Sequence, residues 1–187
     1  MAKIARSRVR FGSMLAAVAF VLASCGGGGG SNAQPDSDLG QRPNLPVDPK
    51  SASGLLPNVT VLDLTNNKWV QFANFLPSDK PVLVWFWAPH CPVCQGEAPG
   101  VEEFAQQNQD KLSVIGIGTQ DTVGEAYDFV ARYKTTFTML WDETFETWLA
   151  FGVSAQPAAM LLTADGQFIN GWMGPFPENE VLRLIGA

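Results

Sequence analysis

The sequence is poor in residues that bind metal ions: its 187 residues include one histidine, His90, and three cysteines. A structural zinc site needs about four such ligands. Cys91 and Cys94 lie beside His90, whereas Cys25 lies far away in the sequence. We therefore expect no metal site. We also expect no cofactor other than a redox-active disulfide between Cys91 and Cys94.

Positive charge is also scarce, with 12 Lys and Arg against 18 Asp and Glu and a formal net charge of −6. Four of the basic side chains lie within the first ten residues, and loss of that segment would take the charge to −10. A surface of this sign repels phosphate backbones. We therefore expect no nucleic-acid partner.

The N-terminal region has no apolar run long enough to span a membrane, which takes about 20 residues. A basic start followed by the short apolar run 14–23 is typical of a signal peptide, which we place at residues 1–24. There is no Arg-Arg pair near the start, so the general secretion route is favoured over the twin-arginine route.

The signal peptide ends in LASC, residues 22–25, which resembles a bacterial lipobox. This resemblance implies that Cys25 becomes the lipidated N-terminus of a protein anchored on the outer side of the cell membrane. Two alternatives stay open: an ordinary signal peptide that releases a secreted protein, or an uncleaved anchor. All three export the rest of the chain.

Residues 25–57 contain five consecutive glycines and five prolines. Such a composition buries too little apolar surface to offset the conformational entropy lost on ordering. We interpret it as a flexible linker that joins Cys25 to one domain at residues 58–187.

That domain alternates short apolar runs with amphipathic stretches, which indicates an α/β fold. We expect strands at 59–64, 82–87, 112–118, 158–163 and 167–173, and helices at 92–108, 123–133, 144–151 and 178–185. The segment 68–76 fits a strand or a turn of helix, and 137–140 fits a short extended piece.

The two cysteines are separated by two residues and follow a predicted strand at the start of a predicted helix. Unpaired N–H groups and the helix dipole favour a thiolate at that position. We therefore expect Cys91 to be the nucleophile and Cys94, one turn into the helix, to be buried and to resolve the mixed disulfide. A purely structural disulfide is the alternative, but one this short would constrain little chain.

Two stretches carry a family resemblance: residues 85–99, WFWAPHCPVCQGEAP, and residues 152–157, GVSAQP. They resemble the thioredoxin fold of the exported bacterial TlpA, ResA and DsbE group, and look most like the actinobacterial DsbE and DsbF type. The resemblance covers about residues 59–185. It implies a central mixed β-sheet flanked by helices and the activity of a thiol–disulfide oxidoreductase.

The resemblance also implies roles around the cysteine pair. Pro157 matches a proline that is cis and faces the disulfide, which would present the backbone of Gln156 to an extended substrate peptide; a simple turn proline is the alternative. Glu97 matches a glutamate near the disulfide that relays a proton to the resolving thiol. The alternative for Glu97 is a helix-surface side chain.

His90 occupies the place where many relatives carry Trp. Protonated, it would help hold the Cys91 thiolate, and neutral, it would exchange protons near physiological pH. A solvent-facing loop residue is equally compatible with the sequence.

Pro92 directly follows Cys91, as in the more oxidising relatives. We therefore favour the oxidation of cysteines in exported proteins, with a membrane redox partner that recycles the disulfide. One alternative is a membrane-anchored reductant of the cytochrome c maturation type, although such proteins usually show Gly where this chain has Ala155. The other is a non-catalytic peptide-binding module. A peroxidase is disfavoured because the sequence has no Pro-x-x-x-Thr-x-x-Cys arrangement.

Overall fold

The computed structural model describes residues 40–51 and 56–186. The predicted signal peptide, Cys25 and the first part of the predicted linker lie outside these residues. None of the helices within the two described ranges is long and apolar enough to cross a membrane.

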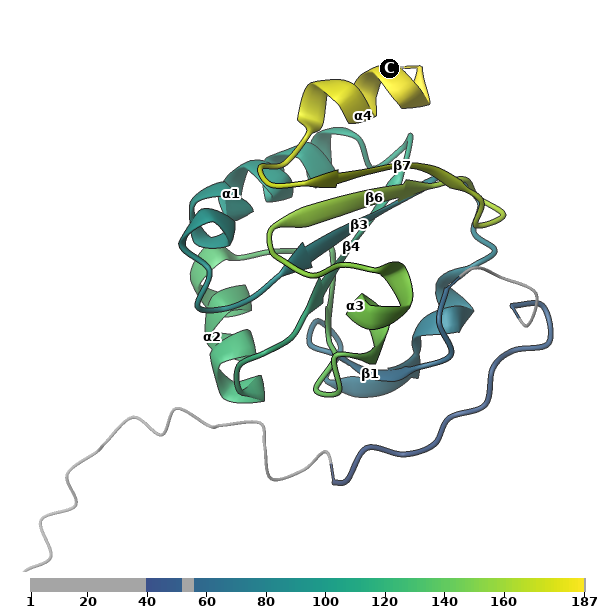
Figure 1. Cartoon of the computed structure of the whole chain (residues 1–187), viewed down its shortest axis with the longest axis vertical. Helices are drawn as coiled ribbons and strands as arrows, with labels where there is room; N and C mark the ends of the chain where they lie inside the picture. The colour runs from purple at the N-terminus through teal and green to yellow at the C-terminus, as the bar shows by residue number, and fades with distance from the viewer. Residues whose placement is uncertain (1–39, 52–55, 187) are drawn as a thin grey trace, which may run out of the picture. The chain divides into compact units, whose positions relative to one another are not determined.

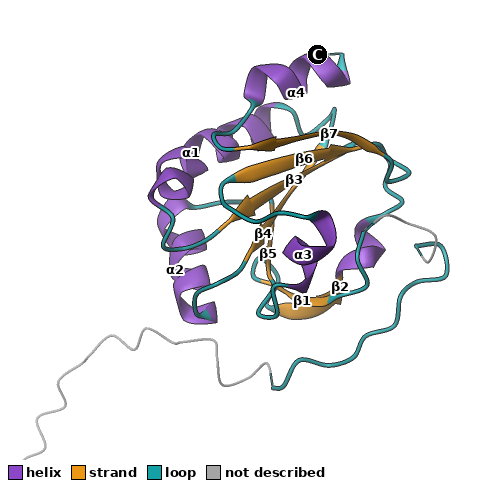
Figure 2. Cartoon of the chain, viewed as in Figure 1, coloured by secondary structure: helices purple, strands orange, loops and turns teal. Residues whose placement is uncertain are grey.

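The domain is built on one seven-stranded sheet with the strand order β2-β1-β5-β4-β3-β6-β7 (Figures 1 and 2). The strands are β1 (Thr60–Asp63), β2 (Lys68–Gln71), β3 (Val82–Trp87), β4 (Ser113–Gly118), β5 (Thr138–Trp141), β6 (Ala158–Leu162) and β7 (Phe168–Met173). The helices are α1 (Pro92–Gln107), α2 (Val123–Tyr133), α3 (Glu146–Phe151) and α4 (Glu178–Ile185), with a 3₁₀ turn, η2, at Phe72–Phe75.

The sheet is mixed, as predicted. β3 pairs in parallel with β4, and β4 with β5, whereas β1, β2 and β6 pair antiparallel to their neighbours. The carboxyl ends of β3, β4 and β5 therefore lie at one edge, together with the start of β6. We call this the active edge, because the cysteine loop follows β3 there.

Both faces of the sheet are covered, with α1 and α2 on one side and α3 on the other (Figure 1). Side chains of β3 alternate between the two layers: Leu83, Trp85 and Trp87 belong to the core under α1 and α2, and Val84 and Phe86 to the core under α3. Burial on both faces explains why this strand is a continuous apolar run. The two tryptophans of this strand, both fully buried, are therefore packing residues.

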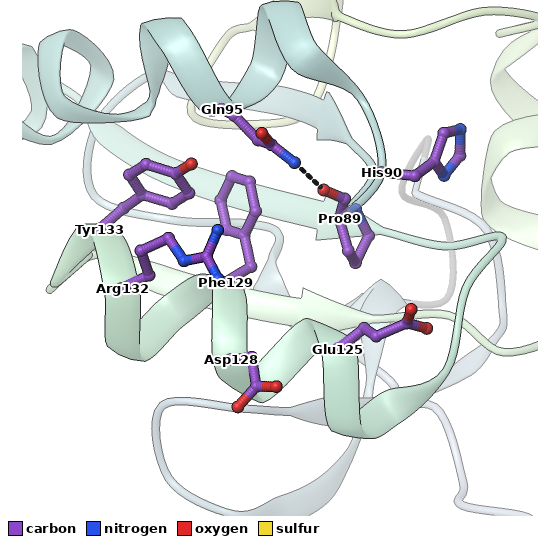
Figure 3. A pocket seen from close by; sticks show the side chains of 8 residues that line it. All are labelled: Pro89, His90, Gln95, Glu125, Asp128, Phe129, Arg132 and Tyr133. Carbon is purple, nitrogen blue, oxygen red and sulfur yellow. Dashed lines mark hydrogen bonds between the residues drawn. The ribbon is translucent and has the colours of Figure 1, made fainter.

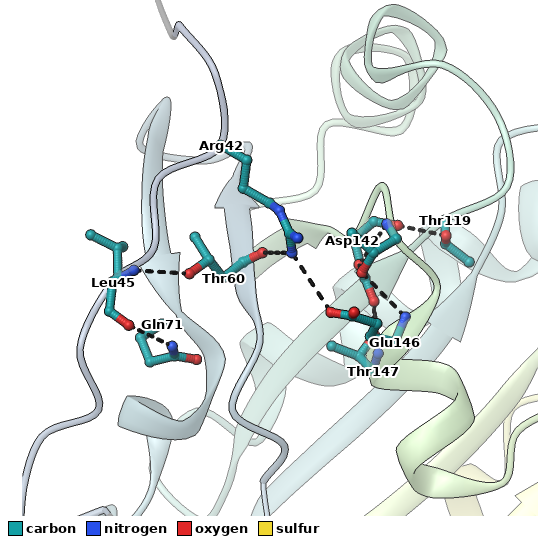
Figure 4. Close-up of polar contacts among 9 residues, drawn as sticks. Arg42, Leu45, Thr60, Gln71, Thr119, Asp142, Glu146 and Thr147 are labelled. Atoms are coloured by element: carbon teal, nitrogen blue, oxygen red, sulfur yellow. Dashed lines mark hydrogen bonds and ion pairs between the residues drawn. The ribbon is translucent and has the colours of Figure 1, made fainter.

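The described part of the predicted linker, residues 40–51, contacts the sheet (Figure 4). The backbone N–H of Leu45 donates to Thr60 Oγ1 at 3.3 Å, and Gln71 Nε2 donates to the Leu45 carbonyl at 3.0 Å. The Arg42 guanidinium donates to the Thr60 carbonyl at 3.4 Å. These hydrogen bonds hold this part of the segment along β1 and β2.

Local differences from the predicted elements are small. The segment 68–76 contains both of the expected structures, strand β2 followed by η2. Helix α3 begins two residues later than predicted, at Glu146. A second cis peptide bond, Leu76–Pro77, was not predicted.

Candidate active site

Cys91 and Cys94 form a disulfide at the N-terminus of α1, with their Cα atoms 5.3 Å apart. Cys91 is the N-cap residue, and its sulfur accepts a hydrogen bond from the Cys94 backbone N–H at 3.1 Å. Cys91 is 5% exposed and Cys94 is fully buried. An incoming sulfur therefore reaches Cys91 first, and the helix N-terminus favours negative charge at that atom.

Three hydrogen bonds fix the loop before the disulfide. The Cys91 N–H donates to the Ala88 carbonyl at 3.1 Å, and Gln95 Nε2 donates to the Pro89 carbonyl at 2.7 Å. The His90 N–H donates to Asp121 Oδ2 at 2.9 Å. The cysteine pair is thus presented by a loop that is tied both to α1 and to the segment between β4 and α2.

The Gln156–Pro157 peptide bond is cis, as the family resemblance implied. Pairing of Phe86 with Ala158 brings this bond to the active edge, beside the loop that follows β3. The Pro157 carbonyl accepts a hydrogen bond from the Gly174 N–H at 2.8 Å, which ties the proline to the segment after β7. The contact of Gln156 with a substrate peptide remains a prediction.

His90 connects these two loops. Its side chain is half exposed, and Nδ1 lies 2.7 Å from Asp121 Oδ2. Its Nε2 lies 3.1 Å from Gln156 Nε2. The structure therefore brings two predicted site residues, His90 and Gln156, into direct contact. It also gives His90 a second partner, Asp121, that the sequence interpretation missed. One signal was available: Asp121 closely follows the strand predicted at 112–118.

Glu97 lies one helical turn after Cys94 and is half-buried. Its Oε1 accepts from Trp85 Nε1 at 2.9 Å and its Oε2 accepts from the Phe176 N–H at 3.0 Å. Burial raises the pKa of this carboxyl above its ordinary value, and the two hydrogen bonds only partly offset the rise. The carboxylate is thus held between β3 and the segment before α4, on the helix face it shares with Cys94.

Replacing Glu97 with Gln is expected to remove one pH-dependent step from the rate of disulfide opening, the fall in rate that accompanies ionisation of Glu97. The raised pKa keeps the carboxyl protonated to a higher pH, where it can donate to the Cys94 sulfur as the disulfide opens. The wild-type rate, corrected for ionisation of the attacking thiol, should fall as Glu97 ionises. The corrected rate of the variant should not change with pH over the same range. Single-turnover reduction between pH 4 and 8 measures this. Glu103→Gln, an exposed change on the same helix, is the control, and identical profiles for Glu97→Gln and wild type would rule out the relay.

A groove of about 250 Å³ runs beside the cysteine loop (Figure 3). Pro89, His90 and Gln95 line one side of it, and five residues of α2 line the other: Glu125, Asp128, Phe129, Arg132 and Tyr133. Within residues 40–51 and 56–186, no cluster of His, Cys, Asp and Glu has a composition that could hold a metal ion. The side chains gathered at this edge include two sulfurs, one imidazole and nearby carboxylates.

Residues 54–170 match the model of the AhpC/TSA family. The chain belongs to this family. The soluble secreted antigen MPT53 of Mycobacterium tuberculosis is 34% identical over 110 residues, which are 58% of this chain and 63% of that protein. The chain thus matches less than two thirds of the length of this curated relative.

Two solved structures share the fold across nearly their full length. MTB dsbF, in its mixed oxidized and reduced forms, is 31% identical with a TM-score of 0.61, over 71% of this chain and 95% of that one. A secreted Mycobacterium tuberculosis disulfide oxidoreductase homologous to E. coli DsbE is 30% identical with a TM-score of 0.57, over 69% and 95%. The predicted resemblance to DsbE and DsbF proteins is confirmed, and the domain is a thioredoxin-like thiol–disulfide oxidoreductase domain.

Proposed function

We propose that the protein oxidises cysteine pairs in exported proteins by passing its Cys91–Cys94 disulfide to them. One observation carries this proposal: the disulfide lies at a helix N-terminus with Cys91 alone reaching the surface. The names of its relatives, a secreted antigen and a secreted disulfide oxidoreductase, support an extracytoplasmic site of action.

The reaction is an exchange of sulfur–sulfur bonds. A client thiolate attacks Cys91 Sγ, the Cys91–Cys94 bond breaks, and its electron pair goes to Cys94 Sγ. A second client thiolate then attacks the client sulfur of the mixed disulfide, and Cys91 leaves as a thiolate that the helix N-terminus stabilises. The client gains a disulfide, and the protein holds two electrons for a membrane redox partner to remove. No further cofactor enters this scheme.

The client would bind as an extended strand beside Gln156 and Pro157. Two exposed apolar side chains support this placement. Val93, between the cysteines, is 49% exposed, and Met173, 58% exposed, pairs across the sheet with Ala158 next to the cis-proline. These side chains would give apolar contacts on both sides of the attacked sulfur.

We further propose that lipidated Cys25 anchors the protein on the outer face of the cell membrane, with a secreted protein as the alternative. Metabolic labelling with a radioactive fatty acid tests this, with Cys25→Ser as the control. Label that depends on Cys25 supports the anchor, and an unlabelled protein in the culture medium contradicts it.

The direction of electron flow is tested by the reduction potential of the Cys91–Cys94 pair. Equilibration with glutathione buffers gives the potential, and refolding of a reduced client gives the activity. A potential well above thioredoxin's roughly −270 mV, together with accelerated formation of client disulfides, is expected. A potential near that value would favour the membrane-anchored reductant. A protein that binds peptides without exchanging thiols would be the non-catalytic module.

A further inference from the structure

Asp121 and His90 form a hydrogen-bonded pair at the rim of the disulfide. One carboxylate oxygen, Asp121 Oδ2, accepts from both the His90 backbone N–H at 2.9 Å and the ring Nδ1 at 2.7 Å. Because an ionised carboxylate only accepts hydrogen bonds, Nδ1 must carry the ring proton. In the neutral imidazole the lone pair therefore resides on Nε2.

This lone pair faces Gln156, next to the place where a client peptide would lie. Nε2 is 3.1 Å from Gln156 Nε2, an amide nitrogen that donates, which agrees with an accepting Nε2. Gln156 immediately precedes the cis-proline, and His90 immediately precedes Cys91. The acceptor therefore lies between the two loops that a client strand must contact, on a half-exposed side chain.

We propose that His90 is the general base that takes the proton from the client thiol as its sulfur attacks Cys91, and that Asp121 is the positioning residue that orients it. This role rests on the proposed function. The client S–H proton moves to Nε2, and the client sulfur bonds to Cys91 Sγ. The Cys91–Cys94 bond breaks with its electron pair on Cys94 Sγ, and the imidazolium then returns its proton to a departing thiolate or to water.

Two carboxylates lie near the His90 ring, which becomes an imidazolium in this step. Asp121 contacts the ring directly, and Glu125, at the start of α2, interacts electrostatically with it. Hydrogen bonds from the Thr122 backbone and hydroxyl lower the pKa of Glu125, which keeps that carboxyl ionised.

Four other groups face His90 or share its groove. Asp128 and Arg132 on α2 contribute opposite charges, Gln95 on α1 is neutral, and Gln156 contacts Nε2. Asp128 and Arg132 offset each other, and of the carboxylates that remain Asp121 contacts the ring directly. Gln156 must release Nε2 when a client arrives, which its partly exposed side chain can do by rotation.

The size of the effect is bounded by thiol ionisation. A thiol with a pKa of about 8.5 is only about 1% ionised at pH 6.5, so a base can accelerate its attack at most about 100-fold there. At pH 9.5 most of the thiol is already ionised, and a base has almost nothing left to remove. A general base therefore leaves a signature that disappears as the pH rises.

The test is single-turnover reduction of the oxidised protein by an excess of a single-cysteine peptide, from pH 6 to 9.5. In His90→Asn, the amide nitrogen replaces the Nδ1 donor to Asp121 while no base remains. We expect this variant to be about tenfold slower at pH 6.5 and less than about twofold slower at pH 9.5. His90→Gln should behave in the same way and serves if the first variant folds poorly.

Asp121→Asn should show the same pH-dependent loss at smaller size, because the ring can then adopt the other tautomer. Asp128→Asn removes a charge from the same groove and should match the wild type throughout. A loss in His90→Asn that is equal at all pH values would mean that His90 only shapes the loop, and overturns the proposal. A tenfold or larger change in the equilibrium constant with glutathione, without the pH-dependent rate loss, would assign His90 to thiolate stabilisation instead. Wild-type protein that fails to react with the peptide at any pH contradicts the proposed function itself.

Discussion

Replacing Cys91 with serine is expected to reduce the turnover of client oxidation to the uncatalysed background, a loss of about 10³-fold or more. The hydroxyl cannot form the disulfide, and Cys94 is fully buried and cannot take over the attack. The fold should survive, because serine keeps an oxygen at the N-cap to accept the Cys94 N–H. Refolding of a reduced client, followed by the recovery of its activity, measures the loss.

Cys94→Ser should separate attack from resolution. Its remaining Cys91 thiol can still enter a mixed disulfide with an oxidised client, but Cys94 is no longer present to release the client by attacking Cys91, so the covalent complex should accumulate on a non-reducing gel. Cys25→Ser is the matched control for loss of a cysteine and should keep full turnover. Turnover by Cys91→Ser above one tenth of the wild-type rate would contradict the assignment of Cys91 as nucleophile.

The sequence was sufficient for the elements whose pattern is local. The bounds of β3, α2 and α4 were predicted to the residue. β3 is a continuous apolar run between two nearby prolines, and α2 and α4 are amphipathic stretches bounded by polar, proline or glycine residues. The position of Cys91 at the N-terminus of α1 followed from the same local pattern. The chemistry of the two sulfurs was therefore predictable from about fifteen residues.

The contacts of His90 were not predictable, because they depend on strand pairing. Asp121 lies 31 residues after His90 in the chain and Gln156 lies 66 residues after it. They meet His90 because β3 lies between β4 and β6 in the sheet. No single-sequence pattern specifies which strands become neighbours. The sequence therefore left open whether His90 is a functional residue or a solvent-facing one.

Glu97 and the segment 40–51 show the same limitation. The helix position of Glu97 was predicted correctly, but one of its partners is the backbone N–H of Phe176, 79 residues away. The composition of residues 40–51 predicts a free linker, yet Leu45 exchanges hydrogen bonds with Thr60 and Gln71. The composition of a segment gives its apolar content, but it does not predict which group will form a hydrogen bond with a particular carbonyl or N–H.

The active edge also depends on a buried carboxylate, Asp142, in the turn between β5 and α3 (Figure 4). The side chain is fully buried and accepts four hydrogen bonds, from the N–H and hydroxyl groups of Thr144 and Thr147, at 2.5–2.9 Å. Its backbone carbonyl accepts from Thr119 Oγ1 at 2.6 Å, two residues before Asp121. Asp142 thus anchors the start of α3 and contacts the loop that carries the partner of His90.

Asp142→Ala is expected to lower the free energy of unfolding by about 3 kcal/mol or more, because it leaves buried donors without an acceptor. With a urea m-value of about 1–3 kcal/mol/M, the midpoint should fall by about 1–3 M. Asp142→Asn keeps one acceptor oxygen, so its midpoint should lie between those of Asp142→Ala and the wild type. Glu143→Ala, a change at an exposed neighbour, should leave the free energy of unfolding within about 0.5 kcal/mol of the wild-type value. A midpoint for Asp142→Ala equal to that of Glu143→Ala would show that the turn rearranges to satisfy its own donors.

The folded fraction of Asp142→Ala should still react with thiols at pH 9.5, where no base is needed, because the substitution leaves the Thr119 contact to the backbone carbonyl in place. A selective loss at pH 6.5 would instead show that the Asp142 turn helps to hold Asp121 against His90.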